Sequence, residues 1–153
     1  MTQTGESLPG STDGEAPETE GLRERLRLAG TNVERERGSR VRVRVNLALG
    51  GREISGELAG VGTETVELRL AAEATLDAIH EAVGRPRFRL LGIKRLHAFD
   101  ADVILVVLQE SEGDEIRRLI GAVPVRSTLV HGAAAAILDA TNRILTRPPE
   151  PEP

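Results

Sequence analysis

The sequence contains no cysteine, no tryptophan and no tyrosine, and only two phenylalanines among its 153 residues. Without cysteine there can be no disulfide, no thiolate metal site and no cysteine nucleophile. The two aromatic residues, Phe88 and Phe99, offer almost nothing on which the bases of single-stranded nucleic acid could stack. No apolar run approaches the roughly 20 residues of a membrane-spanning helix, and no basic-then-apolar signal segment is found. We therefore expect a cytoplasmic protein.

Acidic residues and proline are concentrated in two terminal stretches. Residues 1–20 carry five acidic side chains and no lysine or arginine, in a chain whose formal net charge is -4. This stretch is also rich in Gly, Pro, Ser and Thr, a composition typical of disorder. Residues 148–153 consist of proline and glutamate, which cannot continue a helix. We predict a disordered acidic tail over 1–20, a folded domain over 21–147, and an extended tail over 148–153.

The chain contains an internal repeat. Residues 25–86 align with residues 87–148 without a gap at an offset of 62, with 18 identical positions. The segment RLRLAG at 25–30 falls on RFRLLG, and the alanine-rich segment 71–78 falls on another alanine-rich segment. A fixed period of this kind indicates that two copies of one structural unit follow each other along the chain.

Each repeat is predicted to form three strands followed by a helix. Apolar residues alternate with arginine and asparagine over 40–49, the pattern of a strand with one buried face. A Gly-Gly pair then marks a hairpin turn, and apolar residues over 68–83 recur at helical spacing. Neither unit alone can cover its own sheet. We therefore expect an α+β fold in which two βββα units, 25–86 and 87–148, pack as a pseudo-twofold pair, with sheet on one side and two helices on the other.

The last predicted helix has closely spaced alanines, Ala133, Ala136 and Ala140, followed by Thr-Asn-Arg at 141–143. Together with the preceding strand over 116–123 and the polar turn over 125–128, this pattern resembles the C-terminal regulatory domain of 2-isopropylmalate synthase and citramalate synthase. That domain is also built from two βββα units. These 153 residues contain no catalytic barrel, and the Gly-rich, Asp-containing start of the family's first helix is absent. The resemblance therefore implies a stand-alone regulatory module, and it does not extend to leucine binding.

The strand-to-helix junctions supply the candidate ligand contacts. The first junction contains Gly60, Gly62 and Thr63, and the second contains Ser127 and Thr128. Helix N-termini carry unpaired N–H groups that can hold an anionic group. These five residues are therefore the candidates for binding a small metabolite at the repeat or dimer junction. The alternative interpretation of the first junction is an ordinary turn with a threonine N-cap.

A second candidate site is a basic face in the first repeat. Alternation along neighbouring strands places five arginines on one side of the sheet: Arg25, Arg27, Arg40, Arg42 and Arg44. Such a stripe is typical of a phosphate-binding surface and supports an alternative function, the binding of nucleic acid or of an acidic partner. Glu53 and Glu57 are expected on the same face, where they would pair with the arginines and reduce the net charge.

The two repeats differ in their middle strand. Where the first repeat has Arg42, Arg44 and Asn46, the second has aliphatic residues at the same offset, so its strand is apolar on both faces. Such strands are normally covered on both faces. The gapless alignment places Leu105 and Val107 in the core. The opposite, outward side is predicted to be a homodimer interface, or to be covered within one chain. It consists of Ile93, Ile104, Val106, Leu108 and Leu119.

No pattern of catalytic residues is present. The sequence contains no nucleophile elbow, phosphate-binding loop or dinucleotide fingerprint. Among the histidines only His80 has a carboxylate at helical spacing, Asp77, and we interpret this pair as part of a solvated helix face rather than as metal ligands. We therefore predict a non-enzymatic regulatory or interaction module without metal or cofactor. It is expected to bind either a small effector or a protein partner, and not to bind a membrane.

Overall fold

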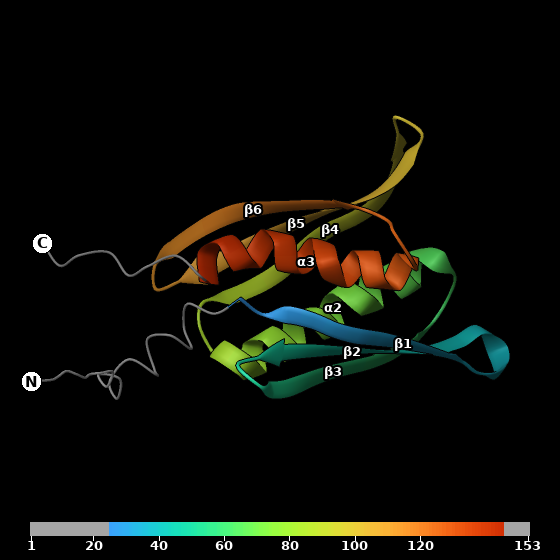
Figure 1. Cartoon of the computed structure of the whole chain (residues 1–153), viewed down its shortest axis with the longest axis horizontal. Helices are drawn as coiled ribbons and strands as arrows, with labels where there is room; N and C mark the ends of the chain where they lie inside the picture. The colour runs from blue at the N-terminus through green and yellow to red at the C-terminus, as the bar shows by residue number, and fades with distance from the viewer. Residues whose placement is uncertain (1–24, 146–153) are drawn as a thin grey trace, which may run out of the picture.

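The computed structural model describes residues 25–145, which form three-stranded sheets and helices in two successive units (Figure 1). The first unit comprises β1 (Arg27–Arg35), the short 3-10 turn η2 (Arg37–Ser39), β2 (Arg40–Leu49), β3 (Arg52–Val61) and α2 (Glu64–Val83). The second comprises β4 (Arg87–Ala98), β5 (Ala101–Glu112), β6 (Glu115–Pro124) and α3 (Leu129–Leu145). The α+β class and the two βββα units are confirmed. The tails predicted over 1–20 and 148–153 lie outside the described residues.

The layers are arranged differently from the expected sheet with two helices on one side. The strands form two separate antiparallel sheets, sheet one in the order β1-β2-β3 and sheet two in the order β4-β5-β6. The two helices lie between the sheets (Figure 1), and each packs on the sheet of its own unit and also contacts the first strand of the other unit. Helix α2 is accordingly buried on several sides, with Leu68, Ala71, Ala74 and Leu76 among its buried residues. The remaining side of α2 is charged and faces solvent, as at Asp77.

Glycine in the third strand of each unit allows the helix to lie directly on the sheet. A Cβ atom added to Gly56 would lie 2.0 Å from the carbonyl oxygen of Ala74, and one added to Gly121 would lie 2.2 Å from that of Ala136. Real Cβ atoms do not approach other atoms this closely. Both units therefore depend on a glycine that faces a helix carbonyl.

The two units correspond element by element, but not at a single offset. Leu28 of β1 pairs with Leu47, as Leu90 of β4 pairs with Leu108, so β2 and β5 correspond at an offset of 61. Leu47 pairs with Ile54, as Leu108 pairs with Leu119, so β3 and β6 correspond at an offset of 65. The first strands and the helices keep the offset of 62. Compared with the first unit, the second has one residue fewer in its first hairpin (β4–β5), four more in its second hairpin (β5–β6) and three fewer before α3. These differences sum to zero, which explains why the sequence aligns without a gap.

The shifted offset reverses the two faces of β5, because moving a strand by one residue moves every side chain to the opposite face. Ile104, Val106 and Leu108 are 0% exposed and lie in the core between sheet and helix. Ile93 and Leu119 pair with Val106 and Leu108 and pack against the same core. The predicted homodimer interface of Ile93, Ile104, Val106, Leu108 and Leu119 is therefore wrong, and the alternative holds: these residues face inward and are covered within one chain. Leu105 and Val107, predicted to be core, face outward.

Hydrogen bonds near the ends of the helices connect the two units in a crossed arrangement. The Nε2 atom of His80 on α2 accepts the backbone N–H of Phe88 at 2.9 Å, and the two rings stack with centroids 6.0 Å apart. At the equivalent position on α3, the side chain of Asn142 accepts the N–H of Leu26 at 3.3 Å and donates to its carbonyl at 3.0 Å. Each helix thus holds the first strand of the other unit. The interpretation of His80 as part of a solvated face is wrong, because the ring anchors a strand.

The role of His80 makes the stability of the fold depend on pH. Burial lowers the pKa of the imidazole, the positive charge of Arg87 lowers it further, and Asp77 partly opposes both effects. The unfolded chain therefore takes up this proton more readily than the folded chain. The neutral His80 ring therefore contributes fully to stability above the unfolded pKa of about 6.5, and this contribution is lost as the pH falls below that value.

We expect the melting temperature of the parent to fall between about pH 7.5 and about pH 5.5 by more than that of a His80→Gln variant. The glutamine can accept the N–H of Phe88 through its amide oxygen but does not titrate. Thermal denaturation followed by circular dichroism measures both slopes. An equal fall in parent and variant would show that other groups control the pH dependence.

Candidate functional site

A cleft of about 560 Å³ opens at the junction of the two units, at the end of the molecule where both helices begin. Strand β1 lines it with Thr31, Val33 and Arg35, the β3–α2 junction with Gly62, Thr63, Glu64 and Glu67, and the start of α3 with Thr128, Leu129 and Val130. We call this the junction cleft. Its lining comes from both units, so the space exists only when the two are packed together.

Most polar side chains of the junction cleft have partners in the cleft or beside it. The guanidinium of Arg35 donates to both carboxylate oxygens of Glu67, one of them at 3.2 Å, and this hydrogen bond and the charge of Glu67 raise the pKa of Arg35. The Thr128 hydroxyl accepts the N–H of His131 at 3.0 Å and so caps the start of α3. In the second unit, the counterpart of Val33 is Arg95, whose guanidinium lies 3.2 Å from the Glu64 carboxylate. Most of the polar side chains that line the cleft therefore already have partners.

Three of the five predicted ligand contacts, Gly62, Thr63 and Thr128, line the junction cleft. The α-carbon of Gly60 faces the side chain of Leu70 instead, and Ser127 lies exposed in the turn before α3 without lining the cleft. Thr63 is the N-cap residue of α2 by position, although its side chain makes no capping hydrogen bond. Ligand binding by these three cleft residues stays a prediction.

Arg35 and Glu67 were not among the predicted contacts. The alternation of side chains along β1 could have indicated Arg35. It follows Thr31 and Val33 on the inward side of the strand, where a charged residue is unexpected. Its partner on α2 follows only from the packing of strand on helix, which the sequence pattern does not give.

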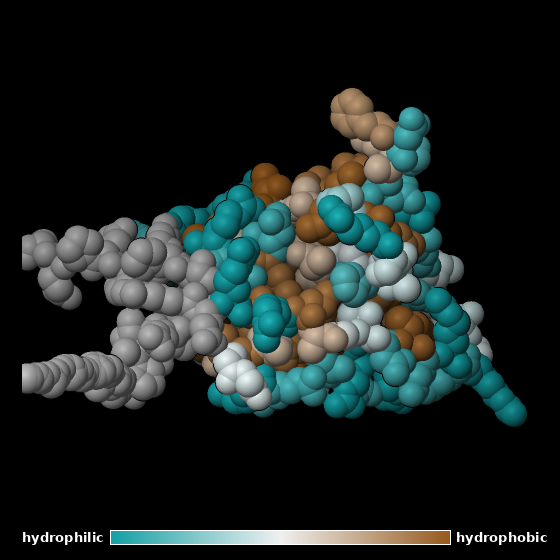
Figure 2. All heavy atoms as spheres, in the orientation of Figure 1, coloured by the Kyte–Doolittle hydropathy of each residue, from teal (hydrophilic) through white to brown (hydrophobic). Residues whose placement is uncertain are grey.

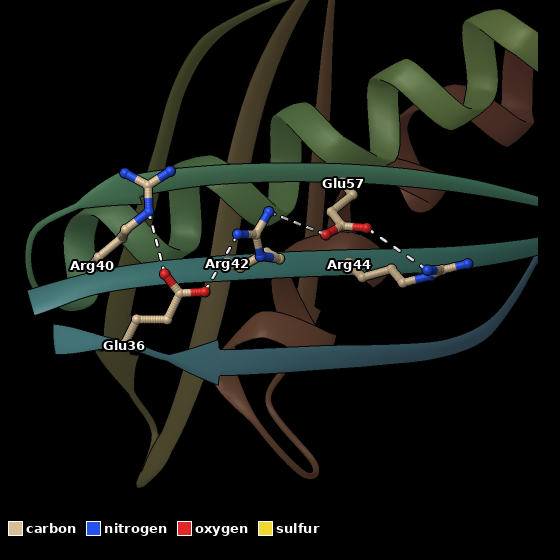
Figure 3. Close-up of polar contacts among 5 residues, drawn as sticks. All are labelled: Glu36, Arg40, Arg42, Arg44 and Glu57. Atoms are coloured by element: carbon tan, nitrogen blue, oxygen red, sulfur yellow. Dashed lines mark hydrogen bonds and ion pairs between the residues drawn. The ribbon is translucent and has the colours of Figure 1, made fainter.

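Three arginines of the basic face pair with carboxylates on the same side of sheet one (Figure 3). Glu36 lies 3.3 Å from both Arg40 and Arg42, and Glu57 lies 3.5 Å from Arg42 and 3.7 Å from Arg44. The hydrogen bond and charge of Glu36 raise the pKa of Arg42. The predicted pairing with these arginines is thus confirmed for Glu57, whereas Glu53 forms no ion pair with an arginine of the described chain. Of the other predicted members, Arg27 pairs with Ala48 at the far end of the sheet, and Arg25 precedes β1.

Sheet two presents an apolar surface instead. The outward side of its central strand β5 carries Val103, Leu105 and Val107, all half-buried, and β6 adds Ile116 and Ile120, which are 64% and 58% exposed. We call these five residues, with Leu96 of β4, the apolar outer face. Figure 2 shows hydrophobic atoms along the edge where β6 runs, whereas the edge formed by sheet one is mostly hydrophilic. No helix of the described chain covers this surface, because α2 and α3 pack on the inner sides of the sheets.

One carboxylate is almost completely buried in sheet two. The Glu110 side chain on the inward side of β5 is 1% exposed, and its Oε1 atom lies 3.1 Å from the Nε atom of Arg117 on β6. Glu110 occupies the position of Leu49 in the first unit. It does not line the junction cleft, and we assign the ion pair to the structure of the longer β5–β6 hairpin.

No protein-family model matches the chain, and no curated protein matches it. The resemblance to the regulatory domain of 2-isopropylmalate synthase therefore stays a prediction. Within residues 25–145, no three His, Asp or Glu side chains lie close enough together to hold a metal ion. None of the helices in this part of the chain is long and apolar enough to span a membrane.

Proposed function

We propose that this chain is a non-catalytic interaction module that binds a protein partner through the apolar outer face of sheet two. The observation that carries the proposal is the composition of β5, which has aliphatic residues on both sides. Ile104, Val106 and Leu108 are covered by the core, and Val103, Leu105 and Val107 face outward. A central strand with this composition is typical of a sheet that is covered on both faces.

The comparison of the two sheets supports the same proposal. Both units fold in the same way and cover the inner side of their sheet with a helix, yet the outer side of sheet one is charged and ion-paired. The fold therefore does not require aliphatic residues on the outer side of sheet two. Contiguous exposed apolar surface on a folded protein commonly marks a binding surface.

The other predicted functions have less support. Binding of nucleic acid by the basic face would have to compete with the ion pairs of Glu36 and Glu57. Binding of a small metabolite in the junction cleft stays a prediction from the sequence, and a ligand would have to compete with the existing partners of Arg35, Glu67 and Thr128. We therefore place the partner surface on sheet two.

Single-cysteine labelling in cells tests whether the apolar outer face is bound there, because the chain contains no cysteine of its own. Ile120→Cys reports on the apolar outer face, and Val61→Cys is the matched control. Both residues are aliphatic, lie on third strands and are similarly exposed, at 58% and 63%. The rate of reaction with a membrane-permeant maleimide is compared between intact cells and dilute purified protein.

We expect Ile120→Cys to react several-fold more slowly in cells than in dilute solution, and Val61→Cys to react at a similar rate in both. Protection of the first site only would show that a partner covers sheet two. Equal reactivity of both sites in cells and in solution would contradict the proposed function, because the surface would then be bare where the protein works.

A further inference from the structure

The β4–β5 hairpin ends in an exposed aromatic residue. Phe99 is fully exposed and has a φ angle of 53°, and the next residue, Asp100, has a φ angle of 62°. A two-residue turn with two positive φ angles normally contains Asn-Gly or Asp-Gly, and a bulky residue in this conformation is unusual. The hairpin stands clear of the body of the molecule (Figures 1 and 2). One of the two aromatic residues of the chain is thus held at a projecting tip.

The outward side of sheet two is basic at the opposite end from this tip. Arg89 and Arg118 flank Gln109 on either side in the strand register, and Arg87 lies one row further on. The outward positions of β4, β5 and β6 carry these cations and Lys94, but no carboxylate. The two acids in the turns at its ends are Asp100, in the β4–β5 turn, and Asp114, in the β5–β6 turn beyond the Arg87 row. The surface therefore has an aromatic tip with one carboxylate, a mainly aliphatic centre with Lys94 beside Leu105, and a basic end.

Leu105 lies midway between the tip and the basic end. Ala101, next to the turn, precedes it by four residues on β5, and Gln109 follows it by four. Each separation corresponds to about 14 Å at 3.4 Å per residue. A rotation of 180° about an axis that lies above the outward side of the sheet and runs across the strands at the level of Leu105 therefore places the tip of one copy over the basic end of another.

We propose that the partner of this surface is a second copy of the chain, stacked face to face with its strands antiparallel. This inference rests on the proposed function and specifies its partner. In this arrangement Asp100 of each copy pairs with Arg89 and Arg118 of the other, and the ring of Phe99 lies against the same guanidinium groups, a favourable cation–π geometry. The same patch meets itself twice, as in an isologous twofold dimer. The aliphatic residues around Leu105 pack at the centre.

Charge disfavours the other face-to-face arrangement. Stacking the two sheets with their strands parallel would set Arg89 of each copy over Arg118 of the other, two contacts between like charges, whereas the antiparallel arrangement brings only the two Lys94 side chains together. The area of overlap between the two sheets limits the affinity of the dimer. Nine residues of β5 and three strands give a footprint of about 400 Å² per copy, against about 800 Å² per partner in a standard interface. We therefore expect a reversible dimer with a dissociation constant in the micromolar range.

A charge swap on the full-length chain tests the pairing. Asp100→Arg and Arg118→Asp are each expected to weaken the dimer at least about tenfold in sedimentation equilibrium. The double variant is expected to recover most of the loss, because each copy then presents Arg at position 100 to Asp at position 118. Phe99→Ser is expected to weaken the dimer as well. Glu53→Arg, an exposed charge reversal on sheet one, is the control and is expected to change nothing.

Thermal denaturation of each variant shows whether it is folded, and all of the substituted side chains are exposed. A parent chain that stays monomeric at every concentration would overturn this inference. If Ile120→Cys is nevertheless protected in cells, the proposed function stands and the partner is a different protein. If Ile120→Cys is not protected, both fail. A parent dimer that the single charge reversals do not weaken, or that the double variant does not restore, would overturn the antiparallel arrangement.

Discussion

A Val106→Arg variant is expected to be unfolded in solution, whereas Val107→Arg keeps the native fold. Val106 is 0% exposed and faces the core between sheet two and the helices. An arginine there would bury a charge without a partner, which costs several kcal/mol, a large part of the roughly 5–15 kcal/mol that stabilise a typical domain. Val107 is half-buried on the outward side, where it pairs with Gly92 and Ile120. A guanidinium at this position reaches water.

Circular dichroism and urea denaturation of the two variants measure this difference. Because the substitutions are identical and the positions adjacent, the pair controls for the chemistry of arginine in a strand. The gapless repeat alignment predicts the opposite outcome, with Val106 outside and Val107 inside. A folded Val106→Arg protein beside an unfolded Val107→Arg protein would therefore show that the faces of β5 are assigned wrongly. Val107→Arg is also expected to weaken self-association, since it introduces a charge next to Leu105.

The second large effect is expected at the glycines that face the helices. Gly121→Ala would bring a Cβ atom to 2.2 Å from the carbonyl oxygen of Ala136 and 2.9 Å from the backbone nitrogen of Ala140. Backbone atoms of a helix cannot rotate away, so sheet two and α3 must move apart. We expect a loss of about 1–3 kcal/mol or more in the free energy of unfolding. Gly56→Ala is expected to act in the same way, because its Cβ would meet Ala74.

Gly92→Ala is the matched control for these variants. Gly92 also lies in a strand of sheet two, but a Cβ atom there would meet nothing within 4 Å. Its replacement is expected to leave stability nearly unchanged or to raise it slightly, because alanine has fewer unfolded conformations. Urea denaturation measures the free energy of unfolding of the three glycine variants, fitted with one common dependence on urea concentration. A Gly121→Ala protein as stable as the parent would mean that α3 lies further from β6 than the structure places it.

The sequence predicted the kinds and order of the elements because their periodicities are strong. The alternation over 40–49 and the apolar spacing over 68–83 each match one structure only. The layering was not predicted, since amphipathic patterns show that a face is buried but not what covers it. The alanines on several sides of both helices contained a signal for the central position that the helices occupy.

The faces of β5 and β6 could not be predicted from the alignment, because three changes in loop length cancel. A strand that is aliphatic on both sides gives no internal indication of its inward side. The useful signal was the pair Gly56 and Gly121, which share the same contact with a helix carbonyl but do not align at an offset of 62. For the junction cleft, the sequence indicated Gly62, Thr63 and Thr128 from helix-start chemistry. It did not indicate Glu67, whose role depends on contact with a distant strand.

The crossed hydrogen bonds have a consequence for the order of the two units along the chain. Asn142 holds Leu26, so the first strand and the last helix of the described chain meet, just as α2 meets β4 through His80 and Phe88. Each helix thus contacts the first strand of the other unit at an equivalent junction. The chain connects the units covalently at only one of these two junctions. A circularly permuted chain that begins at Arg87, joins α3 to β1 through a linker and ends at Val83 would retain every strand pair and both helix–strand clasps.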